Sequence, residues 1–186
     1  MDNAMDSLRN QYAGQVAHIV GKGPSLKYLR AAHFGVGPVI TMNEAIIAVQ
    51  DLGLINPLYS MQKDGLPAMM VRPHEDVTLI VQCNLSEGWF IEHPKRLVID
   101  PVKEWGFVLT EMSIRMCVAL AKFMGCQSIT FISCDSLSTG DMRTYDVLSG
   151  ESSFNGMSGY YEHVVPQVLK DVANIPHHFS VPSEVQ

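Results

Sequence analysis

The chain has 186 residues, of which 47% are apolar and 17% are charged, and its formal net charge is −6. This composition excludes a disordered chain, and the length favours a single domain, residues 1–186. The 13 Lys and Arg residues are scattered along the chain, whereas a protein that binds a nucleic-acid duplex needs a basic stripe. We therefore expect no nucleic-acid partner. A small anionic ligand stays compatible with this charge, because backbone amides can bind phosphate.

No apolar run approaches the roughly 20 residues needed to cross a bilayer, and the first residues lack the basic and apolar regions of a secretory signal. We expect a cytoplasmic protein without a membrane span, and the sequence leaves open whether it forms a homo-oligomer. The cysteines contain no C-x-x-C pair and lie in apolar patterns, at Cys83, Cys117, Cys126 and Cys134. This favours buried free thiols over disulfides or a metal site.

Short apolar runs alternate with helical patterns along the chain. The runs that indicate strands are residues 15–20, 38–42, 58–62, 77–83, 97–99, 128–134 and 178–181. Helices are indicated after Ser25 and over residues 44–52, 111–124 and 160–172. Gly125 suits the end of the third helix, and Pro166 either lies in the first turn of the last helix or kinks it.

Near-continuous apolar strands that alternate with helices predict a mainly parallel sheet of about six or seven strands, covered on both faces. The expected fold class is therefore α/β, a Rossmann-like three-layer α/β/α domain. Residues 65–75 and 136–158 carry no strong period. We expect lid-like loops there, beside the carboxyl ends of the strands, where such folds bind ligands.

The clearest candidate site is the segment Gly21-Lys22-Gly23-Pro24-Ser25-Leu26, between the first strand and the first helix. Gly21 and Gly23 permit a tight turn whose amides can approach an anion, and Pro24 suits a first helical turn. Ser25 can cap that helix or donate to a phosphate. A side chain at position 23 is then expected to remove binding with little unfolding. An ordinary connection without a ligand fits the pattern equally well, and the spacing matches neither the P-loop nor GxGxxG.

This motif resembles the opening motif of the bacterial CMP-sialic-acid-dependent sialyltransferases of glycosyltransferase family 42. It is similar in a broader group of flagellin-modification and 6-hydroxymethylpterin diphosphokinase-like proteins. Three further stretches resemble segments of the sialyltransferases in the same order, residues 41–44, 113–125 and 128–135. The resemblance implies a nucleotide-binding, transferase-like protein that uses a nucleotide-activated donor, of CMP type, and an acceptor that the sequence does not identify. It implies no tightly bound cofactor.

The resemblance also implies site residues. Lys22 stands where the sialyltransferases have a nucleotide-contacting Asn, while Asn43 and Ser113 match nucleotide-contacting positions. Asp135, at the carboxyl edge of the sheet, would face the donor or the acceptor. Asn43 ends a strand, where its amide can bind a ribose or a base edge or can cap the next helix, and the two roles are compatible. Without the resemblance, helix capping explains Ser113 and an ordinary turn explains Asp135.

Other expected site residues replace positions at which the chain departs from the family. Met157 stands where the sialyltransferases have their general base, a His, and we expect His163 to replace it; a surface histidine is the alternative. Leu137 stands where they have a phosphate-contacting Tyr, and we expect Tyr145 to replace another.

Polar residues also follow the third predicted strand, where we expect Gln62 to contact the nucleotide. The next residue, Lys63, could neutralise a phosphate. Asp64 could bind Mg²⁺ or a ribose hydroxyl, and an ordinary turn explains both residues as well.

The sequence is compatible with three functions. The first is displacement at an activated carbon with a nucleotide phosphate as leaving group. The second is ATP-dependent diphosphoryl transfer, for which Asp64, Asp135 or Asp141 would hold Mg²⁺. The third is a catalytically inactive nucleotide-binding module.

Overall fold

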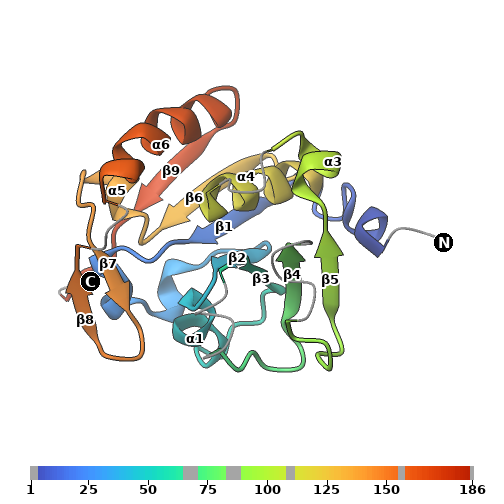
Figure 1. Cartoon of the computed structure of the whole chain (residues 1–186), viewed down its shortest axis with the longest axis horizontal. Helices are drawn as coiled ribbons and strands as arrows, with labels where there is room; N and C mark the ends of the chain where they lie inside the picture. Colours follow the sequence, from blue (N-terminus) through green and yellow to red (C-terminus); the bar gives the residue numbers. More distant parts are fainter. Residues whose placement is uncertain (1–3, 65–70, 83–88, 108–111, 155–157, 185–186) are drawn as a thin grey trace.

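The computed structural model describes residues 4–64, 71–82, 89–107, 112–154 and 158–184. Seven strands form one sheet in the order β5-β4-β3-β2-β1-β6-β9, and every neighbouring pair is parallel. These strands are β1 (Val16–Val20), β2 (Val39–Met42), β3 (Leu58–Gln62), β4 (Thr78–Gln82), β5 (Arg96–Ile99), β6 (Ser128–Ile132) and β9 (His177–Ser180). The predicted Rossmann-like α/β fold is confirmed (Figure 1).

Along the chain, the α-helices alternate with groups of strands, as the sequence pattern predicts. The α-helices are α1 (Ala45–Gln50), α3 (Pro101–Trp105), α4 (Ser113–Phe123), α5 (Asp135–Ser138) and α6 (Ser158–Asp171). Three 3₁₀ segments are η1 (Ala4–Leu8), η2 (Pro24–Tyr28) and η3 (Ala31–His33). Gly125, with φ of 77°, follows α4 in the left-handed conformation that ends helices. Pro166 lies inside α6 rather than in its first turn.

Two apolar cores flank the sheet, because successive side chains of a strand point to opposite faces. In β4, Ile80 packs in the core formed with η1, α4 and α6, while Leu79 and Val81 pack in the core formed with η2 and α1. Both faces of the strands are therefore covered, and this explains their continuous apolar sequence.

The strand order reverses direction at β1. The chain first builds β2, β3, β4 and β5 on one side of β1 and then places β6 and β9 on its other side. In open α/β sheets, the carboxyl ends of the strands at such a switch point border the ligand crevice. A ligand site is consequently expected at the segments that follow β1, β2, β3 and β6.

The segment 136–158, which we expected to form irregular loops, contains most of α5 and an antiparallel hairpin of β7 (Thr144–Asp146) and β8 (Glu151–Ser153). The hairpin is docked on the molecule, because the Tyr145 amide donates to the Lys22 carbonyl at 2.7 Å. Tyr145 and Val147 also pack against the second core. Residues 155–157 of this segment lie outside the described residues. In the other expected lid, residues 65–75, the same holds for residues 65–70.

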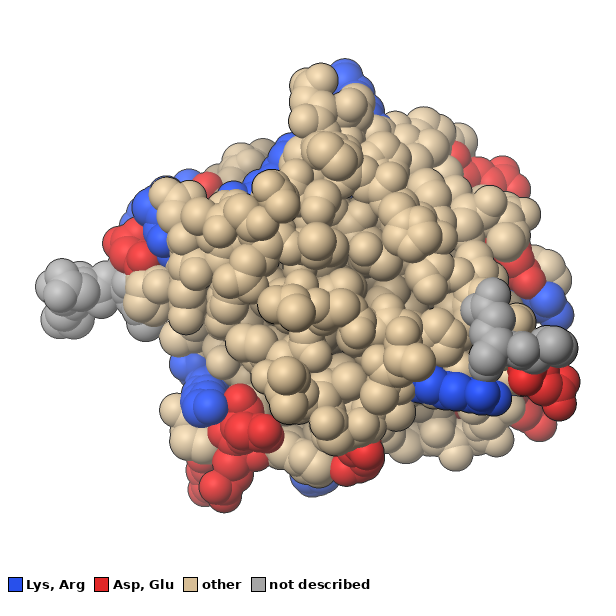
Figure 2. All heavy atoms as spheres, turned by 180° about the vertical axis from the view of Figure 1, so that it is seen from behind, with Lys and Arg blue, Asp and Glu red and all other residues tan. Residues whose placement is uncertain are grey.

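The described cysteines are buried as the sequence predicts, and the basic side chains are scattered over the surface that Figure 2 shows. Cys117, Cys126 and Cys134 are free and buried, as predicted, whereas Cys83 lies outside the described residues. Figure 2 shows a face on which charged side chains lie mainly at the periphery and the basic ones form no stripe. Among the helices that the structure describes, none combines the length and the apolar character that a membrane crossing requires.

Candidate functional site

A cavity of ≈ 380 Å³ opens at the switch point of the sheet. It receives residues from the segments after β1, β2, β3 and β6, from the first turn of α4, from the segment before the hairpin and from α6. This volume lies in the range of small-molecule sites. Six residues that the sequence predicts for the site line it, namely Gly21, Lys22, Gly23, Asn43, Ser113 and Asp135.

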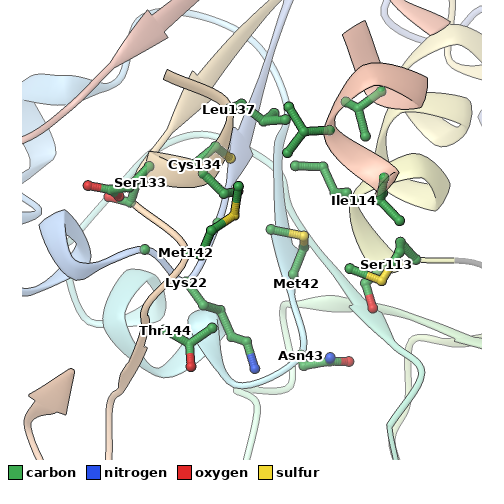
Figure 3. Close-up of a pocket in the computed structure, with 18 of the residues that line it drawn as sticks. Lys22, Met42, Asn43, Ser113, Ile114, Ser133, Cys134, Leu137, Met142 and Thr144 are labelled. Carbon is green, nitrogen blue, oxygen red and sulfur yellow. The ribbon is translucent and has the colours of Figure 1, made fainter. Parts of the chain in front are cut away.

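The cavity has a polar end and an apolar end. Figure 3 shows Lys22, Asn43 and Thr144 at one end and Leu137 and Ile114 at the other, with methionine side chains between them. The polar lining also includes Lys63, Asp64 and Arg143, and the apolar lining includes Met42, Met112, Met142 and Val168. The arrangement suits a ligand with one charged part and one apolar or planar part.

The glycine-rich loop does not present its glycine amides to the cavity. The Gly21 amide donates to the Ile132 carbonyl and the Gly23 amide donates to the Ser133 carbonyl, each at 2.8 Å. A Cβ at position 23 would lie 1.9 Å from Oδ2 of Asp135. The expectation that these amides are available to an anion is therefore wrong, and the glycines let the loop run close to the end of β6. Moreover, η2 is a single short 3₁₀ segment of five residues.

Ser25 and Asp135 form a buried pair beside this loop. The Ser25 hydroxyl donates to Oδ2 of Asp135 at 2.7 Å, so it holds the carboxylate instead of facing a phosphate. Burial raises the pKa of Asp135, and hydrogen bonds from the hydroxyl and amide of Ser25 oppose that rise. Neither Pro24 nor Ser25 lines the cavity, whereas Asp135 does.

Two non-glycine residues adopt positive φ at the cavity wall, Asn43 (47°) after β2 and Ser133 (54°) after β6. Asn tolerates this conformation better than Ser does. The Ser133 hydroxyl is also buried without a hydrogen-bond partner in the part of the chain that the structure describes. Such outliers cluster at functional sites, where the surrounding structure enforces them.

A hydrogen-bonded network holds Asn43 in place. Its Oδ1 accepts from the Lys63 amide at 3.0 Å, and its Nδ2 donates to Oδ2 of Asp64 at 2.5 Å. The Gln62 side chain donates to the main-chain carbonyl of Asn43 at 3.0 Å. Gln62 is fully buried and does not line the cavity, so the predicted nucleotide contact of Gln62 is replaced by support of Asn43. The residue at the N-cap of α1 is Glu44, so Asn43 is no helix cap.

Every basic side chain among the described residues of the cavity wall has a carboxylate near it. Nζ of Lys22 lies 2.5 Å from Oε1 of Glu44, and Nζ of Lys63 lies 3.7 Å from Oδ1 of Asp64. The third, Arg143, lies 2.6 Å from Asp141, whose pKa it lowers through their hydrogen bonds. The local positive charge is thus largely balanced.

Two predicted site residues point elsewhere. His163 is exposed on α6, and it is not among the described residues that line the cavity, although the next residue, Val164, does line it. Tyr145 contributes its amide to the contact with Lys22 and packs its side chain against the second core. Ser113 begins α4 and lines the cavity, while the N-cap position belongs to Met112.

Sequence reasoning missed the methionines of the cavity wall, Met42, Met112 and Met142. Methionine is common in apolar cores, so its pattern carries no signal of its own. Their positions in the sequence could have indicated two of them, because Met42 directly precedes Asn43 and Met112 directly precedes Ser113, which are both predicted site residues.

Comparison with known proteins assigns no family. No protein-family model matches the chain, and no curated protein matches it either.

Proposed function

We propose that this chain binds a nucleotide-activated donor in the cavity and acts as a transferase-like enzyme. The observation that carries the proposal is the cavity of ≈ 380 Å³ at the switch point, with Lys22 and Asn43 at one end, Leu137 and Ile114 at the other, and methionine side chains between them (Figure 3). A nucleotide has the same division into a charged phosphate and a planar base.

The polar end suits the phosphate of the donor. The Lys22 ammonium is paired with Glu44, but it has three N–H donors and can also donate to a phosphate. Ser113 supplies a hydroxyl at the first residue of α4, a helix of 11 residues. The amides of a first helical turn have no partners within the helix, and the helix dipole favours negative charge there. The base would then lie against Met42 and Met142, whose polarisable sulfur atoms make favourable contacts with aromatic rings.

In the proposed reaction, an acceptor hydroxyl oxygen attacks the activated carbon of the donor. A carbon–oxygen bond forms to the acceptor, the bond between that carbon and the phosphate oxygen breaks, and the nucleotide leaves with the electron pair. Asp135 would take the proton of the hydroxyl, since burial raises the pKa of its carboxyl toward the range of an effective base. Lys22 and the amides of α4 would stabilise the negative charge that grows on the phosphate.

The charges of the cavity favour a donor with one phosphate over the alternative, ATP-dependent diphosphoryl transfer. Because Lys22, Lys63 and Arg143 each lie beside a carboxylate, little positive charge is left for a triphosphate. Mg²⁺ would have to supply the missing charge. Within the described residues, no group of three or more His, Cys, Asp or Glu side chains is placed to hold a metal ion.

A thermal-unfolding screen with nucleotides tests binding. CMP, UMP and AMP are compared with ATP, each with and without MgCl₂. A monophosphate at 100 times its Kd stabilises the protein by about 2.7 kcal/mol, which raises Tm by about 5–10 °C. We expect such a rise without Mg²⁺. A rise with ATP only when Mg²⁺ is present would favour diphosphoryl transfer, and no rise with any nucleotide would overturn the proposal.

Two lysines of the same loop region give a matched pair of variants. Lys22→Met removes the charge at the cavity, whereas Lys27→Met removes a charge whose amine lies over the Tyr28 ring, outside the cavity wall. We expect the first to weaken nucleotide binding about tenfold or more, as is typical for loss of a charged hydrogen bond. The second is expected to leave binding unchanged, and equal losses in both would contradict the phosphate placement.

Nucleotide release from a panel of nucleotide sugars tests catalysis. Asp135→Asn keeps the shape of the side chain but removes its capacity to accept a proton. We expect this variant to bind nucleotide and to lose turnover by about 100-fold or more, the usual contribution of a general base. Donors that bind the unmodified protein tightly without any turnover would show a binding module instead of an enzyme.

A further inference from the structure

Asp64 is a carboxylate in the polar end of the cavity. It follows β3, lines the cavity and keeps 49% of its side chain exposed. A carboxylate repels a phosphate, so its place in a site that holds one calls for a different part of the ligand. An ionised carboxylate accepts hydrogen bonds and donates none. The matching ligand groups are therefore hydroxyls or other donors.

The orientation of this carboxylate is fixed by its neighbours. Asn43 donates to Oδ2 of Asp64 at 2.5 Å, and the Lys63 amine lies 3.7 Å from Oδ1. Asn43 is only 3% exposed, and its own amide oxygen accepts from the Lys63 main chain at 3.0 Å. The buried Gln62 side chain donates to the main-chain carbonyl of Asn43. Contacts of this kind lock a side chain in one geometry for a ligand.

The remaining acceptor positions of Asp64 suit a vicinal diol. Each carboxylate oxygen has two lone pairs. Among the described residues, Asn43 donates one hydrogen bond to Oδ2 and the Lys63 amine lies 3.7 Å from Oδ1, and these two contacts leave lone pairs on both oxygens. Two hydroxyls on adjacent ring carbons can donate to one carboxylate at the same time. In dinucleotide-binding α/β folds, an acidic side chain binds a ribose hydroxyl in the crevice at the carboxyl ends of the strands. Asp64 lies in the corresponding crevice, one strand beyond Asn43.

We infer that Asp64 recognises the two adjacent hydroxyls of a ribose, so that the site selects ribonucleotides over 2′-deoxyribonucleotides. The inference rests on the proposed nucleotide binding. It adds a specificity-determining residue and a sugar class to it. A site built to bind a hydroxyl rejects the analogue that lacks it, because its own polar groups lose their partners. Since Asp64 is half exposed, water can replace the lost contact in part, and we expect a preference of about tenfold.

Calorimetric titration of the full chain with CMP and with 2′-deoxy-CMP tests the inference. The unmodified protein should bind CMP about tenfold more tightly. Asp64→Ala should bind the two nucleotides with equal affinity, and Asp64→Asn gives a second variant if the first does not fold. The control is Asp51→Asn, an exposed carboxylate outside the cavity wall with 72% side-chain exposure, and it should keep the preference.

The outcomes separate the inference from the proposed function. Equal affinity of the unmodified protein for both nucleotides overturns the role of Asp64 and leaves nucleotide binding intact. A preference that survives in both Asp64 variants, or one that appears only with added MgCl₂, also overturns it, because another group or a cation then makes the selection. Absence of binding by either nucleotide overturns both proposals together.

Discussion

Replacing Gly23 by Ala tests the close approach of the glycine-rich loop to Asp135. Gly23 has φ of −69° and ψ of 164°, a conformation that Ala adopts freely. The added Cβ would lie 1.9 Å from Oδ2 and 2.5 Å from Cγ of Asp135. The cost of the substitution therefore comes from the clash with Asp135, which supplies the three nearest atoms, and not from the backbone conformation.

The expected cost has two parts. Overpacking of a buried position costs about 1–3 kcal/mol. Moving Asp135 away also breaks its hydrogen bond with Ser25 at 2.7 Å, and a hydrogen bond to a charged group contributes about 1.5–3 kcal/mol. We expect Gly23→Ala to lower the free energy of unfolding by about 2.5–6 kcal/mol and Tm by about 5–24 °C.

Urea denaturation followed by circular dichroism measures this loss. Gly35→Ala is the control, since its Cβ would lie 3.7 Å from the His18 ring, an ordinary contact. In an Asp135→Gly background, Gly23→Ala should cost at least about 1 kcal/mol less, because contacting residues couple in a double-mutant cycle. An unchanged stability of Gly23→Ala, or the same cost in both backgrounds, would refute the proposed contact. It would restore the expectation that an anion, rather than Asp135, occupies that space.

Two further predictions concern buried polar groups. Asp135→Asn should be more stable than the unmodified protein at neutral pH, because burial raises the pKa of Asp135 and so disfavours its charged form. The difference in Tm should shrink as the pH falls through that raised pKa and the carboxyl takes up a proton, and a constant difference between pH 4 and 8 would contradict this explanation. Tyr59→Phe removes the buried hydrogen bond of 2.7 Å between the hydroxyls of Tyr12 and Tyr59; urea denaturation should show a loss of about 1–2 kcal/mol, and an unchanged free energy of unfolding would show that the bond contributes nothing.

Much of the sheet is predictable from the sequence because its strands are buried on both faces. The run Leu79-Ile80-Val81 in β4 is apolar without a break, and the packing of its side chains into two cores explains that pattern. The β7–β8 hairpin could not be found in this way. Its strands have three residues each, and polar side chains such as Thr144 and Glu151 begin them, so no period develops.

The gathering of site residues is also predictable, whereas their individual contacts are not. Gly21, Asn43 and Asp135 follow parallel strands, and the carboxyl ends of such strands meet at one edge. The contact of Gly23 with Asp135 joins segments far apart in the sequence, and no local pattern encodes it. The exposure of His163 could have been predicted, because Val164 and Val168 share the buried face of α6 by their spacing of four.

The tie between the glycine-rich loop and β6 limits how the cavity can respond to a ligand. Two main-chain hydrogen bonds, from the amides of Gly21 and Gly23, join the segments after β1 and β6 beneath the cavity. Widening the crevice at this base would break both bonds, so its base should keep one shape in the empty and occupied protein. Any adjustment to ligand size then falls to lining residues that this tie does not hold, such as Val164 and Val168 of α6 and the methionine side chains.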